Sequence, residues 1–340
     1  SMKLTDLKKD VAKGNLQPIY LIEGPDNYIQ NAAKKILTAL IPEDQQVMNV
    51  GTYDLENTDL GLLLDDAQSS PFFGDYRLVI ANNPVFLTGE KTKVKFNLDG
   101  LINYLKQPEP TTILVFAAKY EKLDGRKKIV KDLKKQATVI DANPPKEADT
   151  RQLIQQFVNE RQIQIASPAV EELILRTGNN LAQVINELEK LTVYAADSKH
   201  IDLEAVQKLV PKSLTQNVFD LIKVLMKGDV RQSIADYSVL LLNQEQPLRI
   251  NAALVSQFRL LLQVKILTER GFSQGKLAQE LKAHPYRIKL AMQAVRQFDM
   301  ASLKRAFLGL LDLEEQLKTT QRPPQELFEL FLVKFKNGWQ

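Results

Sequence analysis

The feature that most limits the fold of this chain is a change of pattern near residue 145. From residue 3 to about 141, short apolar runs alternate with helical stretches, and no convincing strand follows beyond that point. Strands separated by helices predict a mainly parallel sheet covered by helices on both faces. The expected strands are 19–22, 47–50, 78–81, 113–117 and 139–140, and the expected helices are 30–40, 59–68, 98–106 and 126–135.

A proline-containing segment, DANPPKEADT, separates this region from the rest of the chain. Two adjacent prolines cannot continue a helix, so the segment reads as a linker. The sequence therefore predicts an α/β domain over 1–145, followed by all-α regions over 146–211 and 212–340. In the middle region we expect helices around 153–158, from Pro168 behind a Ser167 cap to Gly178, and over 181–194 and 202–209. In the last region we expect helices over 218–226, 233–242, 250–267, 276–281, 288–298, 303–317 and 326–335.

Composition excludes several kinds of active site. The chain has no cysteine and only two histidines, His200 and His284, so disulfides, thiolate metal sites, zinc centres and histidine-based triads are not expected. His284 starts a helix and is expected to be structural. No apolar run approaches the roughly 20 residues of a membrane helix, and Ser1 and Met2 begin no signal peptide. We therefore expect a cytoplasmic protein that binds no metal and no membrane.

Residues 18–37, PIYLIEGPDNYIQNAAKKIL, read as a buried strand, a turn at Gly24 and a helix. This is the layout of a phosphate-binding loop, whose pattern GxxxxGK[ST] needs a second glycine, a lysine and a hydroxyl group. Counting from Gly24, those positions hold Ile29, Gln30 and Asn31. These side chains cannot bind a triphosphate in that way, so the sequence predicts no nucleotide cofactor and no catalytic residue. The search then turns to a binding surface.

One segment carries the whole positive excess of the chain. Residues 121–136 contain seven basic and three acidic residues, a difference equal to the net charge of +4. Ile129, Val130 and Leu133 give this helix an inward face and leave its cations outside. These cations either form a solvated surface or contact DNA phosphates. The candidates for DNA contact are Arg126, Lys127, Lys128, Lys131, Lys134 and Lys135.

Several stretches resemble one protein family in their order and spacing. They are PIYLIEGPDNYIQNAA, SSPFFGDYRLVIANNP, TTILVFAAKYEKLDGRKK, TGNNLAQVINELEKL and HPYRIKLAMQAVRQFDMASLKRAFLGLLDLEEQLKT. Together they are similar to the clamp-loader branch of the AAA+ proteins, and within it to the delta subunits of bacterial DNA polymerase III. The resemblance implies an AAA+-like P-loop-fold domain, a helical lid and a helical collar for oligomerisation.

The same resemblance implies a role in DNA replication. Such a subunit binds the ring-shaped sliding clamp (beta) and opens one of its interfaces without hydrolysing ATP. Its implied partners are the gamma/tau and delta prime subunits and primer-template DNA, in the bacterial cytoplasm. Any nucleotidyltransferase activity belongs to the polymerase complex and not to this chain.

The remaining ATPase positions agree with this interpretation. A hydrolysing relative would end the strand RLVIAN with an acidic pair, where this chain has Ala81, Asn82 and Asn83. In the lid such a relative places an arginine shortly after the glycine, and the residue at that distance from Gly178 is Leu181. A Ser-Arg-Cys motif is impossible without cysteine.

The expected clamp-binding element is Phe72 with Phe73, which follow Pro71 at a turn between a helix and a strand. An arbitrary Phe-Phe pair is more often buried in its own core. In the delta family, however, a hydrophobic pair at this place enters a pocket of the clamp. The family pair is more often leucine with phenylalanine, so Phe72 is a mild departure.

Two other functions fit parts of the sequence. One is an ordinary ATP-dependent AAA+ enzyme, which would need a lysine at Gln30 and acidic residues near Asn82. The other is a DNA-binding scaffold unrelated to clamps, whose DNA binding would not depend on Phe72 and Phe73. Trp339, the only tryptophan, is expected to fray at the terminus.

Overall fold

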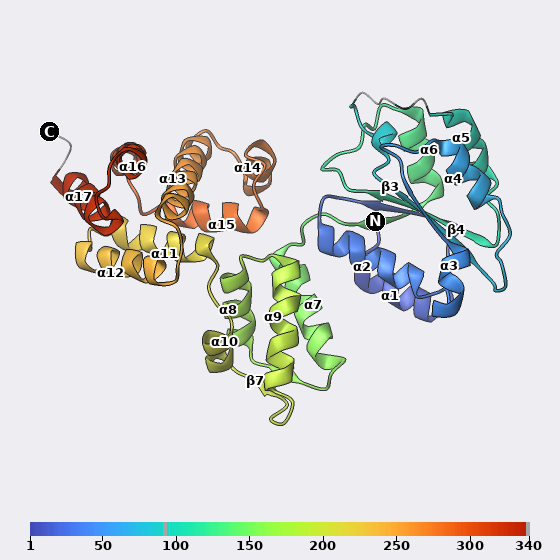
Figure 1. Ribbon diagram of the computed structural model, residues 1–340, viewed down its shortest axis with the longest axis horizontal. Coiled ribbons are helices and arrows are strands. Elements are labelled where there is room, and N and C mark those ends of the chain that lie inside the picture. The colour runs from blue at the N-terminus through green and yellow to red at the C-terminus, as the bar shows by residue number, and fades with distance from the viewer. Residues whose placement is uncertain (91–93, 95, 338–340) are drawn as a thin grey trace. The chain divides into compact units, whose positions relative to one another are not determined.

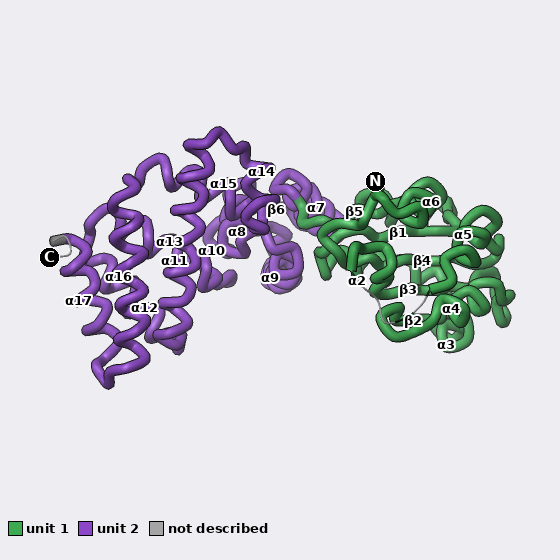
Figure 2. The backbone as a smooth tube through the Cα atoms, turned by 90° about the horizontal axis from the view of Figure 1, so that it is seen from above, with its two compact units in different colours: residues 1–145 green, residues 146–340 purple. Residues whose placement is uncertain are grey.

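The computed structural model describes residues 1–90, 94 and 96–337; Trp339 lies outside these residues. The chain divides into two compact units, residues 1–145 and 146–340 (Figure 2). The expected boundary near residue 211 falls inside the second unit. Each unit is built around its own hydrophobic core.

The first unit is a three-layer α/β structure. Its five strands form one parallel sheet in the order β2-β3-β4-β1-β5. The strands are β1 (Ile19–Glu23), β2 (Val50–Asp54), β3 (Arg77–Asn82), β4 (Thr112–Ala118) and β5 (Thr138–Asp141). The helices are α1 (Leu4–Ala12), α2 (Asn27–Thr38), α3 (Gln46–Asn49), α4 (Leu60–Ala67), α5 (Leu98–Lys106) and α6 (Lys128–Gln136).

Burial follows from this layering. Strand β4 lies in the middle of the sheet and is buried along its whole length, as expected for a strand covered on both faces. Helices α1 and α2 lie on one face of the sheet, and α4, α5 and α6 lie on the other (Figure 1). The α/β class predicted from the alternation of strands and helices is confirmed.

The strand predicted over 47–50 is wrong. Residues Gln46–Asn49 form the short helix α3, and strand β2 begins only at Val50. Val47 is 92% exposed, so the apolar run was not a buried segment. The strand that follows reads VGTYD at the edge of the sheet, next to β3 alone, where a strand needs fewer apolar residues.

The second unit begins with α7 (Glu147–Asn159), α8 (Ser167–Thr177), α9 (Leu181–Tyr194) and α10 (Leu203–Leu209). The expectation of no strand in this part is wrong, because β6 (Gln164–Ile165) pairs in parallel with β7 (His200–Ile201). Strands of two residues are too short to leave a periodic pattern. The cap of α8 also differs: Ala166 is the N-cap, and Ser167 is already helical. Gly178 ends α8 in the left-handed region, with φ +62°, as predicted.

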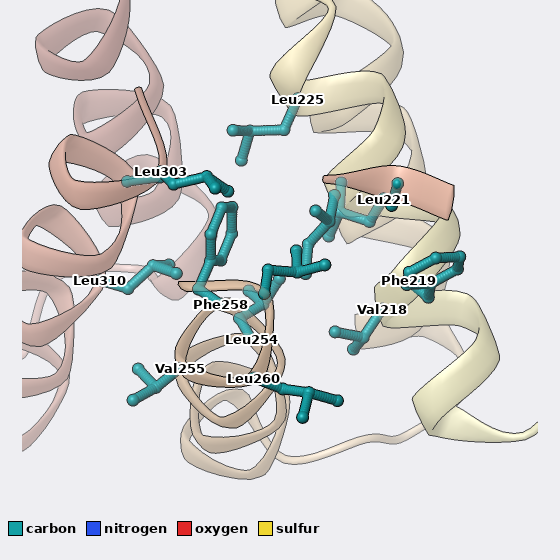
Figure 3. Packing of buried hydrophobic residues seen from close by; sticks show 14 of the residues in the cluster. Val218, Phe219, Leu221, Leu225, Leu254, Val255, Phe258, Leu260, Leu303 and Leu310 are labelled. Atoms are coloured by element: carbon teal, nitrogen blue, oxygen red, sulfur yellow. The ribbon is translucent and has the colours of Figure 1, made fainter. Parts of the chain in front are cut away.

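The remaining helices pack around one long helix. They are α11 (Leu214–Met226), α12 (Val230–Leu242), α13 (Pro247–Glu269), α14 (Gln274–Glu280), α15 (Pro285–Ala294), α16 (Met300–Thr319) and α17 (Pro324–Asn337). All seven predicted helices are confirmed. Helix α13 lies between α11 and α16, where Phe258 and Leu254 meet Leu221 and Leu303 (Figure 3).

Helix α13 also corrects one expectation from the sequence. By length and composition it could cross a membrane, since it has 23 residues and a window of mean hydropathy 1.3. No stretch of that kind was expected. Half of this window is buried inside the unit, with Leu254, Phe258 and Leu261 fully covered. The apolar character of α13 is therefore accounted for by its place in the core.

Candidate functional site

The most exposed aromatic pair of the first unit lies in the loop between α4 and β3. Phe72 is 53% exposed and Phe73 is 79% exposed. Their ring centroids lie 4.8 Å apart at an interplanar angle of 77°, an edge-to-face contact. Neither side chain folds back into the core, which is the usual fate of such residues. Pro71, just before them, is partly buried.

The backbone of this loop is held by a single buried side chain. The Oδ1 atom of Asn49 accepts a hydrogen bond from the Phe72 N–H at 2.6 Å. The Nδ2 atom of Asn49 donates to the carbonyl oxygens of Phe72 at 2.8 Å and Phe73 at 3.1 Å. Asn49 itself has no exposed surface. The loop thus presents its two rings from a fixed backbone.

The loop needs an unusual backbone at its tip. Phe73 has φ +54° and Gly74 has φ +136°. A Cβ atom at Gly74 would come within 2.4 Å of the Oε1 atom of Gln45. The glycine therefore allows the chain to turn sharply after the aromatic pair.

A partly buried ion pair fixes the elements on both sides of the loop. Arg77 of β3 pairs with Asp66 of α4 and donates to the carbonyl oxygen of Met48 at 3.1 Å. Asp66 also accepts from the Tyr53 hydroxyl at 2.9 Å. Burial, followed by this hydrogen bond, raises the pKa of Tyr53. Helices α3 and α4 are thereby tied to the edge of the sheet next to the aromatic loop.

Sequence reasoning missed α3 as part of this surface. Val47 is 92% exposed and Met48 is 56% exposed, on the helix that ends at Asn49. They add apolar surface on the helix from which Asn49 reaches the Phe72–Phe73 loop. No local signal could reveal the role of Asn49, because its partners lie 23 and 24 residues further along the chain.

The loop after β1 is closed by a side chain from α2, the helix that follows it. Gln30 is only 3% exposed, and its Nε2 atom donates to the carbonyl oxygens of Ile22 at 3.1 Å and Gly24 at 2.9 Å. Gly24 has φ +137°, and a Cβ atom there would meet the backbone carbon of Ala142 at 2.2 Å. The glycine is thus required by a close approach of the chain to itself.

The N-terminus of α2 is occupied by an acidic cap. The Asp26 carboxylate accepts from the Ile29 N–H at 3.0 Å, where a phosphate-binding loop would present its N–H groups to an anion. Ile29 is 5% exposed and belongs to the core, whereas Asn31 is exposed. A carboxylate repels phosphate, so these residues do not fit a nucleotide triphosphate.

At the end of β3, where an ATPase has a carboxylate pair, Asn82 contacts a lysine from α2. Lys34 of α2 donates to the Oδ1 atom of Asn82 at 3.2 Å. Burial and the neighbouring charge of Lys119 lower the pKa of Lys34. Asn82 and Asn83 themselves offer magnesium no carboxylate, although Asp54 at the end of the neighbouring strand accepts a hydrogen bond from the Nδ2 atom of Asn83 at 3.1 Å. Leu181, the residue expected in place of an arginine, is 1% exposed in the core of the second unit.

Helix α6 places its apolar and cationic side chains on different faces. Ile129, Val130 and Leu133 are buried, as predicted. Three of the six candidate cations have partners within the chain. Arg126 pairs with Asp124, Lys127 donates to the carbonyl oxygen of Phe86, and Lys134 pairs with Glu23.

The other three cations, Lys128, Lys131 and Lys135, are exposed and have no ion pair among the described residues. Their spacing of three and four places them on one helix face. Elsewhere, in the residues that the structure describes, no three His, Asp or Glu side chains come together as metal ligands. His284 caps α15, and its Nδ1 atom accepts from the Tyr286 N–H.

Three family models match nearly the whole chain. Residues 20–143 match the DNA polymerase III delta subunit, and residues 215–335 match the C-terminal domain of that subunit. Residues 146–208 match a family described as a middle domain. The fold and these matches define a class: a parallel α/β unit followed by helical regions.

The relatives narrow the class to one family. The chain is 36% identical to DNA polymerase III subunit delta of Bacillus subtilis over 97% of its own length and 96% of that protein. It is 25% identical to a probable delta subunit of Aquifex aeolicus, over 75% of this chain and 74% of that one. A solved clamp loader delta protein of B. subtilis superposes with a TM-score of 0.83 and 34% identity, covering 98% of this chain and 99% of that one. The chain belongs to the DNA polymerase III delta subunit family.

Proposed function

We propose that this delta subunit of the clamp loader binds the sliding clamp through the Phe72–Phe73 loop and opens one interface of the ring during DNA replication. In this proposal the chain hydrolyses no ATP itself. Its family membership supports a place in the clamp-loader complex. The observation that carries the proposal is the exposure of two aromatic rings on a loop that Asn49 holds in place.

The exposed rings offer enough surface for a binding hot spot. With about 200 Å² for each phenylalanine, their exposed fractions of 53% and 79% leave roughly 260 Å² in water. At about 25 cal/mol per Å², full burial would contribute about 6 kcal/mol before the costs of association. A pocket on the partner that takes both rings would therefore supply much of the affinity.

Ring opening follows from a difference in binding free energy. A ligand shifts an equilibrium between two states only by the amount by which it prefers one of them. The loop must therefore bind a clamp with a distorted interface more tightly than a closed clamp. No chemical step is needed in this chain. ATP bound by neighbouring subunits would expose or cover the loop, so the source of energy lies in those subunits.

The test is the affinity for purified sliding clamp, measured by surface plasmon resonance. The double variant Phe72→Ala, Phe73→Ala should bind at least about a hundredfold more weakly than the wild type, since each ring is expected to contribute 2 kcal/mol or so. Val193→Ala with Tyr194→Ala is the matched control, because this adjacent pair is also exposed but lies on α9. Equal affinity of the wild type and the Phe72/Phe73 variant would contradict the site assignment.

The absence of ATP hydrolysis has its own test. Gln30 and the Asp26 cap fill the places where a lysine and a phosphate would meet. Equilibrium dialysis with labelled ATP and magnesium should show no saturable binding to the isolated chain. Tight binding that depends on Gly24 and its neighbours would favour the ATP-driven enzyme instead.

Contact with primer-template DNA is the second part of the proposal. It rests on the row of exposed lysines on α6, Lys128, Lys131 and Lys135. The logarithm of the DNA-binding constant should fall linearly with the logarithm of the salt concentration. If each lysine neutralises one phosphate, each should contribute about −0.9 to the slope of that line. Replacing Lys131 by glutamine should reduce the slope by about one unit and leave clamp binding unchanged.

A further inference from the structure

The second unit contains a cavity lined by both polar and apolar residues. Its volume is about 210 Å³, far more than the roughly 30 Å³ that one water occupies in the liquid. The loop between α8 and α9 forms one wall, and helices α11, α13 and α15 form the others. The side chains that matter here are Asn180, Ser213, Gln216, Gln257 and Arg287.

Arg287 brings a positive charge into this cavity without an acidic partner. No described carboxylate pairs with its guanidinium group, which donates to the Oε1 atom of Gln257 at 3.0 Å. Its Nε atom is buried and has no hydrogen-bond partner among the described residues. Burial also lowers the pKa of Arg287, since a desolvated cation without a counterion is disfavoured.

Gln257 adds a second unused donor. Its side chain is 4% exposed, and its Oε1 atom is occupied by Arg287. In the described part of the chain, its Nε2 group has no hydrogen-bond partner. The Nε2 atom does not belong to the buried polar atoms that lack a partner, so it reaches solvent and can donate to water or to a ligand. The Gln257 amide is therefore open to an acceptor in the cavity, whereas the buried Arg287 Nε atom is closed off from it.

Three helices begin at the cavity wall. Asn180 is the N-cap of α9, Ser213 is the N-cap of α11, and Arg287 lies in the first turn of α15. The helices have 14, 13 and 10 residues. Each N-terminus carries a partial positive charge of about one half, which favours anions, while one N–H group of each helix is already bound by its cap residue. Their fields add to the charge of Arg287.

Nearby carboxylates do not neutralise this charge. Asp220 accepts from Gln216, but Lys212 and Lys223 already pair with it. Glu147 lies near Tyr286, and it pairs with Lys289 and Arg151. None of the residues that line the cavity is acidic. The cavity thus keeps a net positive field.

We propose that this cavity binds one phosphate-type oxyanion, held by the guanidinium group of Arg287 and the side-chain amide of Gln257 where three helices begin. The planar fork of arginine suits two oxygens of such an anion. The anion is either free phosphate or the phosphate group of a monoester such as a nucleotide. Because the walls come from α8–α9 and from α11, α13 and α15, the bound anion would join these helices.

The test uses the full chain and inorganic phosphate as the probe, at constant ionic strength with chloride. Phosphorus-31 NMR line broadening and isothermal titration calorimetry should both show one saturable site. Arg287→Gln should weaken phosphate binding tenfold to a hundredfold, the worth of a charge-assisted hydrogen-bonded pair. Arg287→Lys should lie between this variant and the wild type, because it keeps the charge and loses the fork.

Arg296→Gln is the control, since this exposed arginine follows α15 and does not line the cavity. Circular dichroism checks that each variant is folded. Competition by adenosine monophosphate would support the site and identify a phosphate monoester as an occupant, whereas competition by acetate at equal concentration would contradict a phosphate-type site. If the wild type shows no saturable phosphate binding, the proposal is overturned without recourse to any variant. Unchanged phosphate binding by Arg287→Gln would also overturn it.

Discussion

Replacing Asn49 by alanine tests how the aromatic loop is held. The variant removes three hydrogen bonds between one buried side chain and the backbone of Phe72 and Phe73. A hydrogen bond contributes about 1 kcal/mol net, so about 3 kcal/mol is the upper limit. The exposed loop lets water replace part of these bonds, which brings the expected cost of opening down to about 1 to 3 kcal/mol.

Amide hydrogen exchange reports this cost at one atom. The Phe72 N–H donates only to Asn49 among the described residues, at 2.6 Å. In Asn49→Ala its exchange should be faster by roughly tenfold to a hundredfold, because each 1.4 kcal/mol changes an equilibrium tenfold. Asn49→Asp should also loosen the loop. Its carboxylate cannot donate to the carbonyl oxygens of Phe72 and Phe73, and its negative charge repels them.

The clamp-binding assay completes the test. Ordering a mobile loop on binding costs free energy and lowers the affinity. Asn49→Ala should therefore bind the clamp more weakly than the wild type, although Phe72 and Phe73 are unchanged. Asn31→Ala is the control, because Asn31 is exposed on α2. Unchanged exchange at Phe72 in Asn49→Ala would refute the claim that this residue positions the loop.

Three further predictions concern stability and pH. Gly24→Ala should lower the free energy of unfolding by at least about 2 kcal/mol in urea titrations, whereas Gly14→Ala, with open space around its Cβ, should cost only about 1 kcal/mol of backbone strain. Gln30→Leu leaves two carbonyl oxygens without their donor and should cost about 1 to 3 kcal/mol by the same measurement. Burial raises the pKa of Glu147, but hydrogen bonds from Lys289 and Arg151 outweigh it, and the pKa is lowered. Its contribution to stability is therefore present above the ordinary carboxyl pKa and lost as the pH falls through the lowered value, so Lys289→Gln should raise that pKa by NMR and shift acid unfolding to higher pH.

Local patterns predicted most of the architecture. Helix α9 was predictable because Leu181, Val184 and Leu188 recur at helical spacing, and Gly178 marks the end of the helix before it. The buried strand β4 was visible as a continuous apolar run. Such features depend on residues that are neighbours in sequence, which is why one chain without relatives is enough to find them.

Features that join distant segments could not be predicted in this way. Apolar content alone suggested a strand over 47–50, but Val47 is exposed on α3. The turn that carries Phe72 and Phe73 was predicted from the sequence and their exposure from the family resemblance, while the buried Asn49 that fixes them was not predicted. The cavity around Arg287 is formed by three helix starts that lie far apart in the sequence.

The side chain of Gln30 gives the first unit an internal substitute for a ligand. Its amide group spans the carbonyl oxygens of Ile22 and Gly24 and keeps the turn after β1 closed. Because Gln30 belongs to the chain itself, the turn is closed without a bound ligand. The first unit therefore carries its own permanent contact at a place where a ligand-dependent turn would need a bound molecule.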